Sequence, residues 1–197
     1  MEKKILTTPI SEQEIRSLTV GDTIYVTGIL VTGRDAVHQR LIIEEQELPV
    51  DLKGKVLYHA GPIVKEKAGG GYELVAGGPT TSMRMEKLEK EFLEKTGARL
   101  IIGKGGMGNR TVEACRELGA AHAVFPGGCA VLAAECVEEV LGVEWPDLGM
   151  AEAVWILRVK EFGPLVVSID SKGNSLFREN KEQFRQKKEK ALAELAV

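Results

Sequence analysis

The chain has 197 residues, a formal net charge of −3 and 28% charged side chains. This length can bury a substantial hydrophobic core, and the composition is that of an ordinary globular protein. The slightly negative charge gives no reason to expect a nucleic-acid partner, because duplex binding usually requires a basic face. No apolar run approaches the ~18 residues of a membrane span, and the first residues hold no long apolar stretch of the kind found in signal peptides. We therefore expect a cytoplasmic protein without membrane contact.

Three cysteines, Cys115, Cys129 and Cys136, raise the question of disulfides or a metal cluster. Their number is odd, the spacing C-x-x-C does not occur, and Cys115 and Cys136 lie in helical patterns with apolar neighbours. Disulfides are rare in the cytosol. We interpret all three as buried, unreactive thiols.

Hydrophobic periodicity predicts strands and helices that alternate along the chain. Ser11 and Glu14 form a capping-box pattern at a first helix start. In chain order, the elements that follow are a β-branched strand at 22–33, a helix at 34–45, a strand at 55–64 interrupted by Gly61 and Pro62, a short strand at 69–78, a helix at 83–97, a strand with a glycine-rich loop at 98–109, a helix at 110–119, a strand at 120–126, a helix at 129–142 and two β segments at 151–162 and 164–170.

The helix at 83–97 is amphipathic, with Met85, Leu88 and Phe92 on one face and Gly97 as the residue that ends it. Strands that alternate with helices indicate an α/β layered fold, and the early glycine-rich strands favour a mixed central sheet. No repeat or low-complexity linker divides the chain. We therefore expect a single domain over 1–197, with a charged C-terminal helix at about 174–197.

Three glycine-marked turns follow predicted strands, and each supplies one cation. They are TGRDAVH with Arg34, GGPTTSMR with Arg84 and GKGGMG with Lys104. In an α/β sheet, ligands bind where strands end, and helix N-termini there present free N–H groups and partial positive charge. The three cations could therefore converge on one small polyanion. For the two arginines the alternative is an ordinary surface position in a first helical turn, whereas Lys104, between two glycines, caps nothing.

The segment GKGGMG also satisfies the dinucleotide-binding pattern G-x-G-x-x-G through Gly103, Gly105 and Gly108, after a strand and before a helix. The acidic residue that would bind the ribose about 20 residues later is missing, because the next strand ends in AVFPGGCA. No Gly-Lys-Ser/Thr sequence is present either. The glycine pattern alone does not favour a dinucleotide enzyme.

The histidines His38, His59 and His122 show no metal-ligand spacing, so we predict no metal site. His122 lies in an apolar strand and is interpreted as a core residue with satisfied hydrogen bonds. His38 shares a helical face with Arg34, which leaves a site role and a packing role equally open. His59 could orient a loop. Asp35 could pair with a nearby cation, and we assign it no catalytic role.

Six segments, in this order and at this spacing, form a specific set: TGRDAVHQRL, YHAGPIV, GGPTTSMRM, IIGKGGM, FPGGCAVLAA and VSIDSKGN. Together they resemble the β subunit, or C-terminal domain, of class I fumarases and L(+)-tartrate dehydratases. The resemblance covers nearly the whole chain. GPTTSMRM, with GKGG about 20 residues later, is its most diagnostic pair.

The resemblance implies a swivelling β/β/α-type layered domain with a mixed central sheet. It also implies an iron–sulfur hydro-lyase whose 4Fe–4S cluster is held by cysteines of an α subunit, so this chain would bind no cofactor itself. The cluster would act as a Lewis acid on the departing hydroxide. The implied reaction is the reversible hydration of fumarate to L-malate, in an α2β2 complex. The alternatives are dehydration of L(+)-tartrate to oxaloacetate, or a non-catalytic module that binds small anions.

The same resemblance implies that Arg34, Arg84 and Lys104 hold the dicarboxylate, and that Thr80 is the catalytic candidate for proton transfer. The cations agree with the chemistry, because removing a proton next to a carboxylate builds negative charge that preorganised cations stabilise. An alcohol is a poor base near pH 7, so Thr80 would need a neighbouring cation such as Arg84, or a proton relay. The alternative for Thr80 is a helix N-cap hydroxyl.

Overall fold

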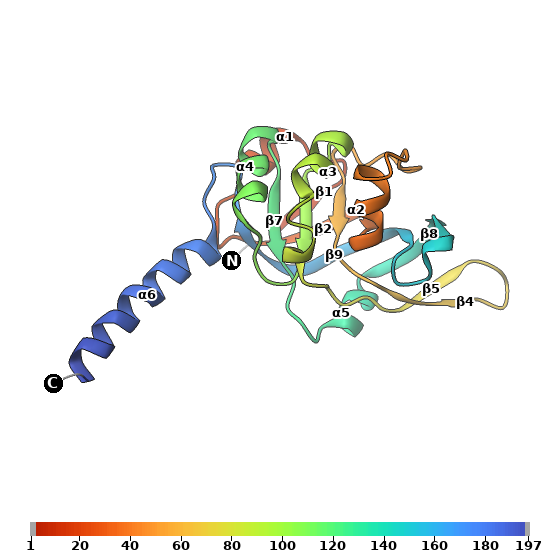
Figure 1. The fold of residues 1–197 in the computed structure, drawn as a ribbon. Helices are drawn as coiled ribbons and strands as arrows, with labels where there is room; N and C mark the ends of the chain where they lie inside the picture. Colours follow the sequence, from red (N-terminus) through yellow and green to blue (C-terminus); the bar gives the residue numbers. More distant parts are fainter. Residues whose placement is uncertain (1–2, 196–197) are drawn as a thin grey trace.

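The computed structural model describes residues 3–195, except for the side chains at 186, 190 and 193–195 (Figure 1). The strands are β1 (Lys4–Thr7), β2 (Thr23–Thr32), β3 (Val56–Tyr58), β4 (Ile63–Glu66), β5 (Tyr72–Ala76), β6 (Leu100–Gly103), β7 (Ala121–Val124), β8 (Val137–Glu144) and β9 (Val154–Ile169). The α-helices are α1 (Glu12–Arg16), α2 (Asp35–Ile42), α3 (Glu89–Thr96), α4 (Asn109–Leu118), α5 (Ala130–Glu135) and α6 (Leu176–Leu195), and the short 3₁₀ helices are η1 (Ser82–Arg84) and η2 (Pro146–Leu148).

The central sheet is mixed and closes on itself. Its seven strands run in the order β1-β2-β3-β6-β7-β9-β8, and a further pairing of β2 with β9 joins β2, β3, β6, β7 and β9 into a closed, barrel-like ring. The neighbours β1, β2, β3, β6 and β7 are parallel, whereas β9 is antiparallel to β2, β7 and β8. Strands β4 and β5 form a separate hairpin. The predicted α/β fold with a mixed central sheet is confirmed.

Alternate residues along each short strand point to opposite faces of the sheet, and both faces are buried. All five strands of the ring contribute to one apolar cluster, which includes Tyr58, Ile102 and Phe162. Their strand neighbours Leu57 and Ile101 belong to a second cluster, packed against α2, α3 and α4. This two-sided burial explains why the sequence at β3 and β6 is continuously apolar rather than alternating.

Several predicted elements are confirmed, including the capping box of α1, in which the Ser11 hydroxyl accepts from the Glu14 N–H and the Glu14 carboxylate accepts from the Ser11 N–H. Strand β2 and helix α4 are also close to their predicted bounds. Gly97 ends α3 in the left-handed conformation, as expected. The strand predicted at 55–64 is divided into β3 and β4, which belong to different sheets.

Two helix predictions are partly wrong. Helix α3 begins only at Glu89, because the Ser82 N–H donates to the Lys104 carbonyl (3.0 Å) and holds the preceding segment against β6. The helix predicted at 129–142 ends at Glu135, and its second half is strand β8, paired antiparallel with β9. The valines of β8 pack on the barrel cluster, so tertiary packing overrides the helical pattern. The two β segments predicted at 151–170 form one strand, β9.

Helix α6 confirms the predicted charged C-terminal helix and extends away from the body of the molecule (Figure 1). The last two positions of that prediction, 196–197, lie outside the described residues, and the single-domain assignment stays a prediction. Among the helices within residues 3–195, none combines the length and the apolarity needed to cross a bilayer.

We predict that a chain ending at Asn180 keeps the stability of the full chain. The described side chains from Lys181 to Leu192 are exposed, so their removal should change the free energy of unfolding by less than about 0.5 kcal/mol. Phe162→Ala, inside the barrel, is the contrasting variant and should cost about 3–5 kcal/mol. Urea unfolding followed by circular dichroism measures both. A loss above about 2 kcal/mol on truncation would show that α6 stabilises the body.

Candidate functional site

The carboxyl ends of the parallel strands β2, β3 and β6 meet at one rim of the barrel. These strands are adjacent, with Thr32 paired to Tyr58 and Tyr58 paired to Ile102. Arg34 follows β2, and Lys104 follows β6 directly. The topology therefore brings two of the three predicted cations to the same rim, as expected for ligand sites in α/β sheets.

The segment 79–82 lies between the ends of β3 and β6. The Thr80 N–H donates to the His59 carbonyl (2.7 Å), and the Lys104 N–H donates to the Thr80 carbonyl (2.9 Å). Thr81 forms a parallel bridge with Lys104. Thr80 and Lys104 are thus joined through their backbones.

The alternative role of Thr80 as a helix N-cap is wrong. The segment enters the 3₁₀ helix η1, whose N-cap is Thr81 and which has no side-chain capping bond. Helix α3 has Leu88 at its N-cap, so Thr80 caps neither helix. Thr80 is half-buried, and its hydroxyl has no hydrogen-bond partner within the described part of the chain. The hydroxyl is therefore available to a ligand.

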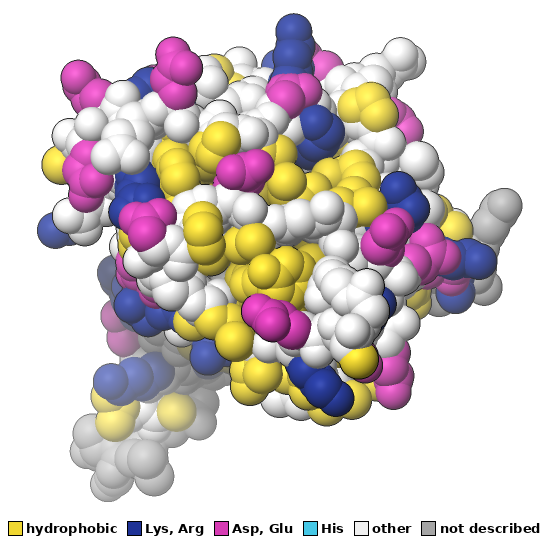
Figure 2. Space-filling model, turned by 90° about the vertical axis from the view of Figure 1, so that its right-hand side faces the viewer, with side chains coloured by type: hydrophobic (Ala, Val, Ile, Leu, Met, Phe, Trp, Pro, Cys, Tyr) yellow, Lys and Arg dark blue, Asp and Glu magenta, His cyan; other side chains and the backbone are white. Residues whose placement is uncertain are grey.

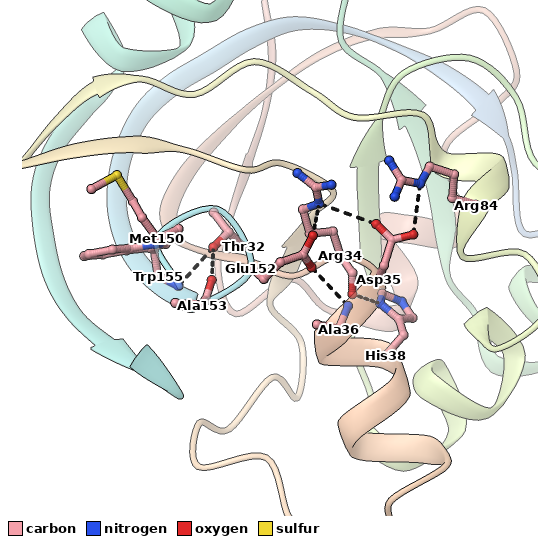
Figure 3. Close-up of polar contacts among 10 residues, drawn as sticks. All are labelled: Thr32, Arg34, Asp35, Ala36, His38, Arg84, Met150, Glu152, Ala153 and Trp155. Carbon is pink, nitrogen blue, oxygen red and sulfur yellow. Dashed lines mark hydrogen bonds and ion pairs between the residues drawn. The ribbon is translucent and has the colours of Figure 1, made fainter. Parts of the chain in front are cut away.

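Arg34 and Arg84 lie on either side of the Asp35 carboxylate (Figure 3). Arg84 Nε contacts Asp35 Oδ1 at 2.9 Å, and Arg34 Nε lies 3.5 Å from Asp35 Oδ2. Figure 3 shows the terminal nitrogens of Arg34 turned away from Asp35 and those of Arg84 turned toward the side of Arg34. The predicted pairing of Asp35 with a cation is confirmed, and it brings the two arginines together.

A second carboxylate orients Arg34. Glu152 Oε1 lies 2.8 Å from Arg34 Nε, while its other oxygen accepts from the Ala36 N–H (3.0 Å) at the start of α2. The loop that supplies Glu152 is tied to the end of β2, because the Trp155 N–H donates to the Thr32 hydroxyl (2.9 Å; Figure 3). The Arg34 side chain is 19% exposed, whereas that of Arg84 is 51% exposed. Arg34 is therefore the more firmly held of the two.

Gly61 gives Arg34 its space. A Cβ at Gly61 would lie 2.5 Å from Arg34 Nη1 and 2.9 Å from the Ala151 carbonyl oxygen. A side chain at this position would have to displace the guanidinium group. The glycine at position 61 is therefore explained by the space that the Arg34 side chain needs, and not by the geometry of the sheet.

The side chain of Lys104 is exposed, and its methylene stem passes 3.3 Å from the place of a Cβ on Gly127. Its ammonium group has no ion-pair or hydrogen-bond partner among residues 3–195. The rim thus holds three cations, Arg34, Arg84 and Lys104, and the two carboxylates of Asp35 and Glu152. Three positive charges minus two negative charges leave a net charge of +1.

The glycine-rich loop 103–108 does not present a free anion site. Both oxygens of Glu86 occupy the start of α4, where they accept from the N–H groups of Gly108 (2.7 Å) and Arg110 (3.0 Å). A Cβ at Gly103 would lie 1.9 Å from the Ser82 hydroxyl oxygen. The glycines therefore admit Glu86 and Ser82, and the structure offers no phosphate cradle at this helix start.

All three histidines lie under the rim and are buried, with 0–1% of each exposed. His38 Nε2 and His59 Nε2 each lie 3.2 Å from Glu89 Oε2, and His59 Nδ1 lies 3.0 Å from the Ser82 hydroxyl. His122 Nε2 lies 3.0 Å from the same hydroxyl. We name this set the histidine chain; its members are His38, Glu89, His59, Ser82 and His122.

The expectation that His122 is a satisfied core residue is confirmed, because its Nδ1 also lies 2.6 Å from the Ser168 hydroxyl. His38 packs against Phe92, with ring centroids 4.3 Å apart, and also contacts the Arg34 carbonyl (2.9 Å). Glu89 and Ser82 were not predicted as site residues. Glu89 could have been identified from the sequence, because it lies on the apolar face of α3, three residues before Phe92.

Burial and charge pairing shift the pKa values in the histidine chain. The pKa of Glu89 lies far below its usual range: burial opposes this, but the facing His59 and His38 outweigh it. Burial lowers the pKa of His59 and lowers that of His122 to about 3. Glu89 is therefore ionised, and His122 is neutral near pH 7.

The cysteines do not form a cluster site. Cys115 is buried, which raises the pKa of its thiol, and Cys129 and Cys136 are half-buried and free. Within the described chain, the one set of three side chains whose ligand atoms could surround a metal ion is His38, His59 and Glu89. The cysteine arrangement therefore does not fit an iron–sulfur cluster.

Residues 2–180 match the family model described as the Fumarase C-terminus. The chain belongs to this family. It is 54% identical over 193 residues to the L(+)-tartrate dehydratase subunit beta of Escherichia coli K12, covering 98% of this chain and 96% of the relative. A protein of Methanocaldococcus jannaschii, provisionally named an L(+)-tartrate dehydratase subunit beta, is 42% identical over 174 residues, which are 86% of this chain and 89% of that protein.

A longer relative comes from Geobacillus stearothermophilus and is provisionally named a class I fumarate hydratase. It is 44% identical over 177 residues, which are 89% of this chain but 34% of that protein. The family resemblance inferred from the motifs is confirmed. Both enzyme names describe hydro-lyases, and members of the family occur both as separate subunits and as parts of longer chains.

We predict that acid destabilises the fold partly through His122. Its pKa of about 3 in the folded chain returns to about 6.5 on unfolding, so the unfolded chain binds the additional proton between these values. Stability should therefore fall as the pH is lowered through this window. Urea unfolding at pH 7.5, 6 and 5 should show that His122→Gln loses about 1 kcal/mol less than the unchanged protein between pH 6 and 5. Equal losses would contradict the neutral, buried state of His122.

Proposed function

We propose that this chain is the β subunit of a hydro-lyase that adds water to, or removes water from, a four-carbon dicarboxylic acid. The observation that supports it best is the rim itself. Arg34 and Arg84 flank Asp35 at the same edge that carries Thr80 and Lys104. These are the four positions for which the family resemblance implies substrate binding and catalysis.

The two arginines suit a substrate carboxylate. Each is held through Nε by a carboxylate of the chain, which leaves the planar end of the guanidinium group for a ligand. That end can donate two parallel hydrogen bonds to a carboxylate, whereas Lys104 adds a point charge. We propose that the three cations bind the dicarboxylate and stabilise the charge that develops when a proton leaves the carbon next to it.

Thr80 is the proposed proton-transfer residue. Its hydroxyl is half-buried and unpartnered within residues 3–195, and its backbone is held between His59 and Lys104. An alcohol transfers a proton poorly near pH 7 unless its neighbours stabilise the alkoxide. We propose that the cations of the rim supply that stabilisation.

A second subunit is part of the proposal. The rim has a net charge of +1 from this chain, so a dianionic substrate would not be neutralised without further groups. Figure 2 shows apolar side chains gathered on the face that carries β4, β5 and β8, and exposed apolar residues there are Ile63, Val75 and Leu141. Exposed apolar patches of this kind mark protein interfaces.

We propose that an α subunit covers this face in an α2β2 complex and holds the iron–sulfur cluster, which would act as a Lewis acid on the substrate hydroxyl. The names of the separate relatives, which call them beta subunits, favour such a partner. We also propose a cytoplasmic location, because the three cysteines are free thiols.

The candidate substrates are fumarate, hydrated to L-malate, and L(+)-tartrate, dehydrated to oxaloacetate. Both are C4 diacids and use the same cations. Fumarate follows from the family as a whole, whereas the 54% identity over nearly the full length of a tartrate dehydratase subunit favours tartrate. The specific activity of the reconstituted complex with each acid decides between them.

We predict that Arg84→Ala lowers kcat/KM of the complex at least about 100-fold, with little effect on folding. The loss follows because a charge-assisted contact to the developing negative charge is removed. Anaerobic mixing with the iron–sulfur α subunit and both acids provides the assay. Arg158→Ala is the matched control, since Arg158 is 50% exposed and pairs with Glu139 much as Arg84 is 51% exposed and pairs with Asp35.

An unchanged rate for Arg84→Ala would contradict its role at the site. If the chain binds the acids but the complex turns over neither, the protein is an anion-binding module rather than a hydro-lyase subunit. Thermal-shift titration of the isolated chain with malate, fumarate and tartrate measures that binding.

We predict that the Thr80 hydroxyl, rather than its shape, is required for turnover. Thr80→Val preserves the shape without the hydroxyl and should lower kcat by about 100-fold or more, whereas Thr80→Ser retains the hydroxyl and should stay within about 10-fold of the unchanged enzyme. Steady-state kinetics of the reconstituted complex measures both. Equal rates for the two variants would exclude Thr80 from proton transfer.

A further inference from the structure

The histidine chain touches the backbone on both sides of the proposed site. At one end, His38 contacts the carbonyl oxygen of Arg34 (2.9 Å). Further along, His59 and His122 both contact the hydroxyl of Ser82 (3.0 Å each). Every member of this chain is almost completely buried.

The directions of the hydrogen bonds follow from the ionised Glu89. Its carboxylate can only accept and lies 3.2 Å from His59 Nε2, so His59 carries its hydrogen on Nε2 and has a lone pair on Nδ1. The Ser82 hydroxyl donates to that lone pair and accepts from His122 Nε2. The Ser168 hydroxyl then donates to His122 Nδ1, the nearer of its two contacts (2.6 Å against 3.3 Å). Ser82 therefore uses both its donor and an acceptor position on imidazole rings.

His38 forms the other end of the histidine chain. The Arg34 carbonyl can only accept, so His38 Nδ1 carries a hydrogen. His38 Nε2 lies 3.2 Å from Glu89 Oε2, the same oxygen that His59 Nε2 faces.

Ser82 connects this chain to the site. Its N–H donates to the Lys104 carbonyl (3.0 Å), and the Lys104 N–H donates to the Thr80 carbonyl (2.9 Å). His59 holds the same segment from the other side, because its carbonyl accepts from the Thr80 N–H (2.7 Å). Arg84 follows Ser82 by two residues within η1. The position of three of the four proposed site residues thus depends on where Ser82 sits.

Gly103 makes this contact possible. A Cβ there would lie 1.9 Å from the Ser82 hydroxyl oxygen and 3.2 Å from His59 Nδ1. The backbone of Gly103 needs no left-handed conformation, so the close approach of Ser82 accounts for the glycine.

We propose that the histidine chain positions the site. Hydrogen bonds with His59 and His122 fix the Ser82 hydroxyl. Ser82 in turn determines where Thr80, Arg84 and Lys104 lie relative to the substrate. This proposal rests on the hydro-lyase function above. Ser82 acts through its neighbours, so it is a positioning residue and not a catalytic one. Misplacement of reacting groups by about 1 Å can lower the rate about 100-fold, and we expect an effect of this size when the hydrogen bonds to Ser82 are lost.

The first test compares Ser82→Ala with Ser168→Ala in the reconstituted complex. Both variants remove one buried serine hydroxyl that contacts His122, and both should lower the urea midpoint to a similar extent. Ser82→Ala should reduce kcat/KM about 10- to 100-fold, whereas Ser168→Ala should stay within about threefold. Equal reductions, or none, would overturn the proposal and leave the histidine chain a structural feature only.

A second pair of variants, His59→Asn and His59→Gln, separates the contact of His59 with Ser82 from its contact with Glu89. The amide of Asn takes the place of Nδ1, and its oxygen can still accept from Ser82, whereas the amide of Gln takes the place of Nε2 and faces Glu89. His59→Asn should therefore retain clearly more kcat than His59→Gln. The reverse order would overturn the assignment of Ser82 as the contact that matters.

A third measurement needs no activity. In ¹⁵N NMR spectra of the isolated full chain near pH 7, His59 and His122 should carry their proton on Nε2. Ser82→Ala should move the amide signals of 80–84 and Lys104, and Ser168→Ala should not. A proton on Nδ1 of His122, or one zinc ion per chain in the purified protein, would overturn the proposal; zinc would make His38, His59 and Glu89 a metal site instead.

The readouts separate the two proposals. If the unchanged complex is inactive with fumarate and tartrate while the amide shifts follow the expected pattern, the hydro-lyase function fails and the positioning of the segment by Ser82 stands. If the complex is active and Ser82→Ala behaves like Ser168→Ala, the function stands and the positioning role fails.

Discussion

The antiparallel pairing of β2 with β9 is the constraint on which the site depends. It closes β2, β3, β6, β7 and β9 into a ring, so these strands have no free edge along that pairing. Because β2, β3 and β6 are parallel within the ring, their carboxyl ends meet at one rim. Arg34 and Lys104, which are 70 positions apart in the sequence, therefore follow two strands, β2 and β6, that lie on either side of β3.

Under that rim the protein buries polar groups where an apolar core would be simpler. Unpaired buried polar atoms cost folding free energy, and a buried ion pair is often no more stabilising than well-packed apolar residues. Yet the histidines, Ser82 and Glu89 lie directly between the helices and the barrel, and they touch the backbone of Arg34 and the segment after β5. Such a network is better understood as fixing one arrangement of the rim than as adding stability.

Local patterns predicted the parts of the fold that local physics controls. The capping box of α1, strand β2 and the glycine that ends α3 follow from caps, β-branched residues and left-handed glycine. Strand β8 and the late start of α3 could not be predicted, because long-range contacts with β9 and with Lys104 decide them. In the proposed site, charge and motif selected the three cations and Thr80, and these residues follow strands that end at one rim. Glu89 and Ser82 were missed because their partners lie on other strands and helices.

The N-termini of helices α2 and α4 do not offer free N–H groups to a ligand, so the proposed site must bind its ligand through side chains. The sequence suggested that free N–H groups at helix N-termini would help to bind an anion. The structure fills those positions with the chain's own carboxylates, Glu152 at α2 and Glu86 at α4. Recognition is therefore left to side-chain cations that Asp35 and Glu152 orient through Nε. Guanidinium groups held in this way can bind the paired oxygens of a carboxylate, which supports the proposed dicarboxylate ligand, whereas the backbone amides that could hold a phosphate at these helix starts are already occupied.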